Sequence, residues 1–260
     1  MTTTILRHEL YRTVRPLLAI VGIAVLVIAL ADFAGMFIGV IGLVLAAMVA
    51  AMMLPAVQLF HAIDFYQSSY GSGAMLTHLL PISGRKLFWT KLLYAVLITT
   101  LTGIVSLAII LLQVRLGMAA VDLNLTEAYT ELQQIFTTPG IWAAIVFFAL
   151  WVLLVPLVSM FPSVVIGSGG WARRLSFGGP IIVFMGYYLV MQLVGVASLF
   201  MPPVYDFFTG QVRMVSLWHV IAINDPNPAM PLAIFGFQLV ALAALLIWAS
   251  RAMNSKVELR

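Results

Sequence analysis

Charged residues divide this chain into long uncharged segments. No Lys, Arg, Asp or Glu occurs within 33–63, 92–114, 132–172, 175–205 or 226–250. Each segment is long enough for a helix that crosses a bilayer, which needs about 20 apolar residues. The pattern predicts six spans, at about 16–32, 36–60, 90–113, 140–163, 177–200 and 229–250.

The first two predicted spans lie close together in the sequence. The apolar stretch from Leu17 to Phe60 is too long for one crossing and suits two. We therefore expect a tight turn around Asp32 to Gly35. We also expect the first span to be retained rather than cleaved as a signal peptide, because its charged leader is long and a second apolar run follows at once.

Composition agrees with this pattern. The chain has 260 residues, of which 63% are hydrophobic, and its mean hydropathy of +1.11 excludes a soluble globular protein. The absence of cysteine excludes disulfides, thiolate catalysis and Cys-based metal sites. The fold class predicted is an all-α polytopic membrane protein, with 1–260 as a single transmembrane domain.

The basic residues predict the orientation in the membrane. With both termini cytoplasmic, only Arg115 and Arg213 of the 13 Lys and Arg residues lie outside. This bias follows the positive-inside rule, so the net charge of +4 is an orientation signal and does not indicate nucleic acid. The predicted inner residues are Arg7, Arg12, Arg15, Arg85, Lys86, Lys91, Arg173, Arg174, Arg251, Lys256 and Arg260.

Two segments outside the predicted spans have recognisable patterns. Residues 3–15 carry Leu6, Leu10 and Val14 at intervals of four, with basic residues between them, which predicts an amphipathic helix on the inner membrane surface. Residues 201–228 are rich in proline and aromatic residues. We expect an outer hairpin there that dips back toward the membrane.

The inner loop 61–91 holds the main functional signal. Gly71 and Gly73 free the backbone, and Ser72 can cap a short helix that Pro81 ends. The helix presents one apolar face, and Ser83 can cap the next helix. Such a face must be covered by lipid headgroups, by the chain's own spans or by a groove on a partner protein. Its apolar residues are Met75, Leu76, Leu79 and Leu80.

The end of this loop resembles a known family. The run Pro81-Ile82-Ser83-Gly84-Arg85-Lys86-Leu87, followed by Lys91-Leu92-Leu93, is similar to a stretch in permease subunits of the type-2 ABC transporter family. Asp64 and Gly71-Ser72-Gly73 stand where that family has an acidic residue and a Gly/Ser-rich turn after the second span. The six-span layout, the N-terminal surface helix and the outer hairpin also look like that family.

The resemblance implies a mechanical role. The loop between spans two and three would form a coupling helix that docks in a cytoplasmic ABC ATPase, which binds ATP and Mg. A second permease copy or a sister permease would complete the pathway in the bacterial inner membrane. The weaker second contact would be Trp171 with Arg173 and Arg174, whose alternative role is that of a positive-inside anchor. The implied coupling residues are Ser72, Gly73, Met75, Leu76, Leu79, Leu80, Pro81, Ser83, Arg85 and Lys86.

Catalytic chemistry has little support in the sequence. No Lys follows Gly in a P-loop pattern, so an ATPase would be a separate chain, and no pair of histidines has the spacing of a metal site. We expect no catalytic residue, no metal and no cofactor in this chain. Asp64 is expected to cap a helix or to pair with Arg85 or Lys86. Tyr187 and Gln192 are candidates for a substrate path, or for hydrogen bonds between helices.

The sequence therefore favours a permease subunit of an ATP-driven exporter. Its uncharged, aromatic-rich spans point to an amphiphilic compound, a lipid-like molecule or a peptide as cargo. The alternatives are an ion-coupled secondary transporter, which usually keeps a carboxylate within the membrane, and an intramembrane enzyme.

Overall fold

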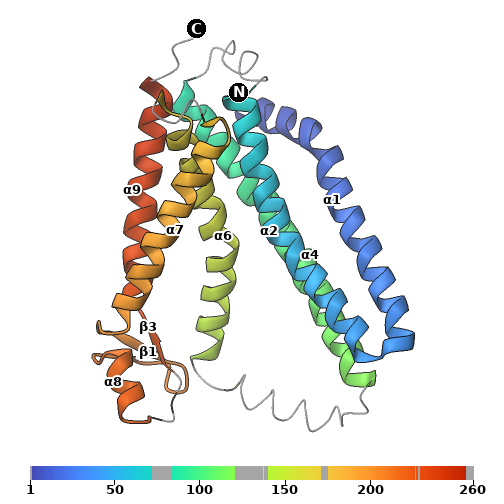
Figure 1. Ribbon diagram of the computed structural model, residues 1–260, viewed down its shortest axis with the longest axis vertical. Helices are drawn as coiled ribbons and strands as arrows, with labels where there is room; N and C mark the ends of the chain where they lie inside the picture. The colour runs from blue at the N-terminus through green and yellow to red at the C-terminus, as the bar shows by residue number, and fades with distance from the viewer. Residues whose placement is uncertain are drawn as a thin grey trace. The chain divides into compact units, whose positions relative to one another are not determined.

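The computed structural model is predominantly helical (Figure 1). It describes residues 2–71, 83–120, 137, 140–170, 175–225, 227 and 229–255. Six helices within these residues are long and apolar enough to cross a membrane, which confirms the predicted multi-pass membrane protein. They are α1 (Thr2–Ile38), α2 (Val40–Ser69), α4 (Gly84–Ala120), α6 (Ile141–Gly167), α7 (Gly178–Ser198) and α9 (Ala233–Ser255).

The turn between the first two helices lies later than predicted. The expected turn at 32–35 is wrong, because α1 continues to Ile38 and the chain reverses at Gly39, whose φ is 65°. Glycine adopts this left-handed conformation without steric penalty. Gly35, read in the sequence as part of the turn, instead lies in α1 against the backbone of Gly42 in α2.

The predicted surface helix is the first part of α1 and not a separate element. The helix is continuous through Pro16, whose missing N–H removes one backbone hydrogen bond, and Figure 1 shows α1 bending in its N-terminal part. The buried residues there are Ile5, Glu9, Thr13 and Leu17. Leu10, one of the apolar residues predicted to face the membrane surface, is 44% exposed.

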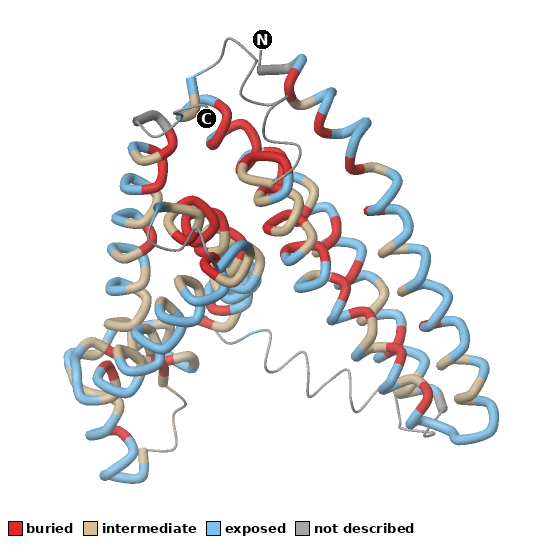
Figure 2. The backbone as a smooth tube through the Cα atoms, turned by 45° about the horizontal axis from the view of Figure 1, so that its top comes forward, coloured by how far each residue is buried: buried red, intermediate tan, exposed pale blue. Residues whose placement is uncertain are grey.

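The chain has two compact units, and the first contains α1, α2 and α4. Its core includes Ile28 of α1 with Ala46, Ala50 and Met53 of α2. The Ser106 hydroxyl of α4 donates a hydrogen bond to the Ala50 carbonyl at 2.6 Å. Figure 2 shows that buried positions follow one side of these helices. Large apolar side chains on their other sides are exposed, as expected for helices that face lipid.

The second unit contains α6, α7, α9 and a small cap. The cap consists of strands β1 (Val204–Asp206), β2 (Val212–Arg213) and β3 (Ala229–Pro231) with helix α8 (Leu217–Ala222). The strands form an antiparallel sheet in the order β2-β1-β3, with Val204 opposite both Arg213 and Pro231. The expected simple hairpin at 201–228 is thus a three-stranded sheet with a helix, and the last span begins at Ala233, after β3.

Candidate coupling site

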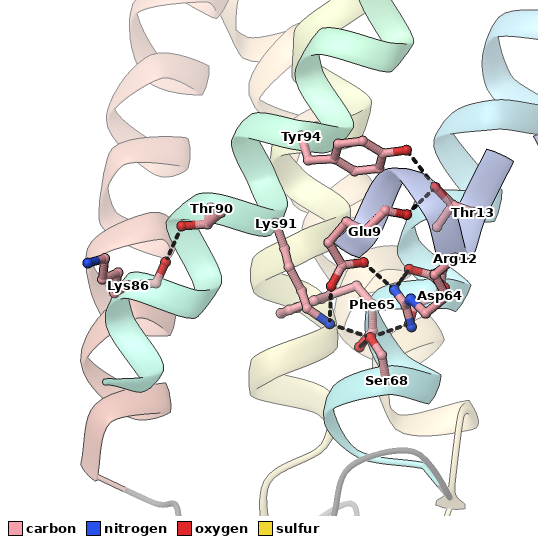
Figure 3. Close-up of polar contacts among 10 residues, drawn as sticks. All are labelled: Glu9, Arg12, Thr13, Asp64, Phe65, Ser68, Lys86, Thr90, Lys91 and Tyr94. Carbon is pink, nitrogen blue, oxygen red and sulfur yellow. Dashed lines mark hydrogen bonds and ion pairs between the residues drawn. The ribbon is translucent and has the colours of Figure 1, made fainter. Parts of the chain in front are cut away.

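Four charged side chains from three helices meet at one end of the first unit (Figure 3). Glu9 and Arg12 come from α1, Asp64 from α2 and Lys91 from α4. Arg12 forms ion pairs with both Glu9 and Asp64, the latter between Nη2 and Oδ2 at 2.5 Å. Lys91 Nζ lies 3.4 Å from Glu9 Oε1. We call these four residues the ionic cluster.

The ionic cluster is balanced in charge and partly sealed from solvent. Two carboxylates face two cations, while Glu9 is only 5% exposed and Lys91 only 4%. Burying a charge is costly unless an opposite charge and hydrogen bonds replace its water. The cluster meets that condition, because each charged group in it has at least one oppositely charged partner.

Hydroxyl groups extend the cluster and link the same helices. Lys91 Nζ donates to Ser68 Oγ at 2.5 Å, and Ser68 Oγ in turn donates to the Asp64 carbonyl at 2.7 Å. Thr13 Oγ1 donates to the Glu9 carbonyl at 2.8 Å and lies 2.5 Å from the Tyr94 hydroxyl. Since the single proton of Thr13 is used on the carbonyl, Tyr94 is the donor in that pair.

Helical spacing explains why these side chains converge. Glu9 and Thr13 are four residues apart on α1, and Asp64 and Ser68 are four apart on α2. Lys91 is three residues before Tyr94 on α4, so each helix presents two polar groups on one face. The sequence reasoning missed this cluster, although the i, i+4 placement of Glu9 and Thr13 was a signal that could have revealed it.

The predicted partner of Asp64 was wrong. Asp64 pairs with Arg12 of α1, and neither Arg85 nor Lys86 forms an ion pair among the described residues. Arg85 and Lys86 are exposed, and Figure 3 shows the Lys86 side chain pointing away from the cluster. The family resemblance counts both cations among the implied coupling residues, and their exposure leaves them accessible for a contact.

Most of the predicted coupling helix lies outside the described residues, which end at Gly71 and resume at Ser83. Those outside are Ser72, Gly73, Met75, Leu76, Leu79, Leu80 and Pro81, and the same holds for Trp171, Arg173 and Arg174, the predicted second contact.

The helix ends beside this segment are held by aromatic packing. The Phe65 ring lies 6.5 Å from the Tyr70 ring and 6.0 Å from the Phe88 ring, measured between centroids. Burial raises the pKa of the Tyr70 hydroxyl above its ordinary value. Phe65 lies on α2 and Phe88 on α4, so both ends that bracket 72–82 are packed against each other.

The predicted substrate-path residues do not share a face. Tyr187 is half-buried on α7, whereas Gln192 is exposed. Five residues on a helix correspond to about 140° of rotation. The two residues therefore lie on different sides of α7.

A second ion network lies in the cap of the other unit. Arg213 Nη1 is 2.8 Å from Asp225 Oδ2 and 3.4 Å from Asp206 Oδ2. Asp206 Oδ1 accepts the backbone N–H groups of Phe208 and Thr209. We call Asp206, Arg213 and Asp225 the cap network.

Hydrogen bonds set the ionisation of the cap network. The Asn227 backbone N–H and the Arg213 guanidinium lower the pKa of Asp225. Hydrogen bonds from Arg213 to Asp225 and Asp206 raise the pKa of the guanidinium. Both groups therefore stay charged at neutral pH.

Comparison with known proteins gives no family assignment. No protein-family model, curated protein or solved structure matches this chain significantly. Within the described residues, no group of three or more His, Cys, Asp or Glu side chains could hold a metal ion. The six apolar helices define a multi-pass membrane protein with a transporter-like architecture.

Proposed function

We propose that this chain is the permease subunit of an ATP-driven exporter of the type-2 ABC family. A separate ATPase chain would bind ATP and Mg and would dock on the segment 72–82. The observation that carries the proposal is the ionic cluster, which joins α1 to the two helices that bracket this segment.

The ionic cluster would give a coupling mechanism a rigid connection between the three helices next to the segment 72–82. A force applied to 72–82 reaches α2 through Gly71 and α4 through Ser83. Removing one partner of a buried ion pair costs about 3–5 kcal/mol, so the three helices resist separation at this end. Movement of the docked ATPase would therefore displace α1, α2 and α4 together as one body.

Exposed cations support docking at the same end. Arg85 and Lys86 lie in the first turn of α4, directly after the segment, and no described acidic side chain pairs with them. A carboxylate on a partner surface would find both of them accessible. The sequence resemblance around Pro81 to Lys91 supports the same assignment.

The proposal also implies a second permease, a location in the membrane and a class of cargo. Half of a translocation pathway requires a second copy of the chain or a sister permease in the bilayer, here the inner membrane of a bacterium. The exposed surfaces of the helices are apolar, which suits an amphiphilic compound, a lipid-like molecule or a peptide as cargo. The pathway would open and close as the ATPases below it associate and separate.

Charge placed on the predicted docking face tests the proposal. The full chain with Leu76→Asp and Leu79→Asp should lose co-purification of a P-loop ATPase from its own membranes, with at least a tenfold loss of nucleotide hydrolysis in the purified complex. The matched control is Thr77→Asp with His78→Asp, which adds the same charge to the same segment outside the apolar face and should retain the ATPase.

Two outcomes would overturn the proposal. One is equal recovery of the ATPase with the docking-face variant and with the control. The other is uphill transport by vesicles that contain this chain alone and no nucleotide, which would favour the ion-coupled alternative.

A further inference from the structure

Asp32 lies inside a membrane-spanning helix, where the sequence placed a turn. It is six residues before the end of α1 and contacts Gln113 of α4. Gln113 Nε2 donates to Asp32 Oδ2 at 3.1 Å. This contact is at the opposite end of the first unit from the ionic cluster, since α1 and α4 run from one end to the other.

Asp32 differs from the other acidic residues that the structure describes. Glu9, Asp64, Asp206 and Asp225 each lie within 4 Å of an Arg or Lys nitrogen. Asp32 has no such partner within the described residues, and its contact is the neutral amide of Gln113. A negative charge at Asp32 would therefore lack the compensation that the other four carboxylates have.

Two oxygen atoms of this pair are buried without a hydrogen-bond partner among the described residues. They are Asp32 Oδ1 and Gln113 Oε1, and the Gln113 residue is only 3% exposed. An ionised carboxylate and an amide oxygen can only accept hydrogen bonds, so neither can satisfy the other. Exchanging Nε2 and Oε1 of the Gln113 amide leaves the same problem, because Oε1 would then face Asp32 Oδ2, another oxygen that only accepts.

We propose that Asp32 is a proton-binding site. As a carboxylic acid it would donate from Oδ1 to Gln113 Oε1 while Oδ2 accepts from Nε2. This closes a ring of two hydrogen bonds between α1 and α4. One bound proton thus satisfies both unpartnered oxygens and removes the uncompensated charge.

The surroundings of the pair favour the neutral acid. One turn away on α1 is Ile28, and one turn away on α4 is Ile109, and both belong to the apolar packing of the unit. On α2, no titratable residue occurs between Val40 and Phe60. The charged residue nearest to Gln113 on α4 is Arg115, which is exposed and forms no ion pair with Asp32.

Proton loss would change the contact between the two helices. The ionised carboxylate would present Oδ1 to an amide oxygen, and repulsion between the two acceptors would replace one of the two hydrogen bonds. Asp32 would then either draw water into the pair or move away from Gln113. The site gives α1 and α4 a contact at this end that depends on a proton, whereas the ionic cluster holds them at the other end.

Infrared spectroscopy of the purified full chain in lipid vesicles tests the proposal directly. At neutral pH the wild type should show the C=O stretching band of a protonated carboxyl group, and labelling with [4-¹³C]aspartate should shift it. The band should be lost in Asp32→Asn, an isosteric change whose amide can still form both hydrogen bonds. The matched control, Asp225→Asn in the cap, should retain the band.

A second variant keeps the test decisive even if Asp32→Asn fails to accumulate. In Gln113→Leu the band should move to higher frequency, because Asp32 Oδ2 no longer accepts the amide N–H. Absence of the band in the wild type, or its persistence in Asp32→Asn, would overturn the proposal. So would loss of the band on replacing choline chloride with sodium chloride at constant pH, which would indicate a cation site instead.

This inference does not rest on the proposed function. The infrared band reports Asp32 with no ATPase present, so either idea can fail without the other.

Discussion

The two units of this protein each contain an arginine that bridges two carboxylates, but the negative charge of those carboxylates is compensated differently in each unit. Arg12 lies between Glu9 and Asp64 in the ionic cluster, and Arg213 lies between Asp206 and Asp225 in the cap network. The ionic cluster adds a second cation, Lys91, and reaches neutrality through side chains. The cap network has one cation for two acids.

Backbone groups supply the missing compensation in the cap. Asp206 accepts two backbone N–H groups and Asp225 accepts one from Asn227. Hydrogen bonds of this kind stabilise the charged form of a carboxylate. The comparison indicates that helices packed in a membrane depend on side-chain charges from their neighbours, because their own N–H groups are used within the helix.

Removal of Lys91 should have the largest effect of the changes considered. In Lys91→Met the buried Glu9 keeps only Arg12, and the Ser68 hydroxyl loses its donor. We expect a decrease of about 3 kcal/mol in the free energy of unfolding, the lower end of the range for breaking a buried pair, because Arg12 remains. Thermal unfolding of the purified wild type and variant in detergent measures this loss of stability.

A double variant shows whether charge is the cause. Glu9→Gln combined with Lys91→Met removes one charge of each sign and should recover more than half of the lost stability. An equally unstable double variant would show that packing of the lysine stem, and not its charge, is what matters.

Replacement of each arginine by lysine compares the two networks directly. Lysine carries a compact, strongly hydrated charge on a flexible stem, so it holds two carboxylates in a fixed geometry less well than a planar guanidinium does. Arg12→Lys should lower stability by about 1 kcal/mol, since a lysine holds the ion pairs to Glu9 and Asp64 together less well. Arg213→Lys should have the smaller effect, because backbone N–H groups still hold both acids. Equal unfolding temperatures for the two variants would contradict this difference.

Acid should have the smallest effect of these changes, and it should reduce the stability from the cap network only at low pH. Because the pKa of Asp225 is lowered in the folded protein, its contribution is fully present above the unfolded value of about 3.9 and is lost as the pH falls through the folded value. The wild type should therefore lose more stability than Asp225→Asn as the pH falls from about 4 to about 2. If the unfolding temperatures of the wild type and Asp225→Asn fall equally over that range, the Asp225 carboxylate makes no contribution to stability.

The sequence predicted the helices better than it predicted their polar contacts. Spans are readable because a bilayer requires long uncharged segments, and the six helices follow them. The turn at Gly39 was missed because Asp32 was taken to mark the membrane surface, whereas a carboxyl group can remain in a helix if it finds a partner such as Gln113. The sheet of the cap was missed because its strands have only two or three residues each.

The ionic cluster could not be predicted from charge patterns alone. Arg12 and Lys91 were counted as orientation signals, a reading that depends only on where a basic residue falls in the sequence. Whether it also pairs depends on which helices are neighbours, and Glu9 precedes Asp64 and Lys91 by more than fifty residues. Only the fold brings these residues together.

The backbones of α1 and α2 touch where they leave their shared turn. A methyl group added at Gly42 would overlap Gly35 Cα and the Ala31 carbonyl oxygen, both backbone atoms that cannot rotate aside. Glycine at position 42 is therefore required for this close approach of the two helices. Contact between the two helices is thus fixed at both ends, by backbone packing at this glycine pair and by the ion pair of Arg12 with Asp64 at the far end.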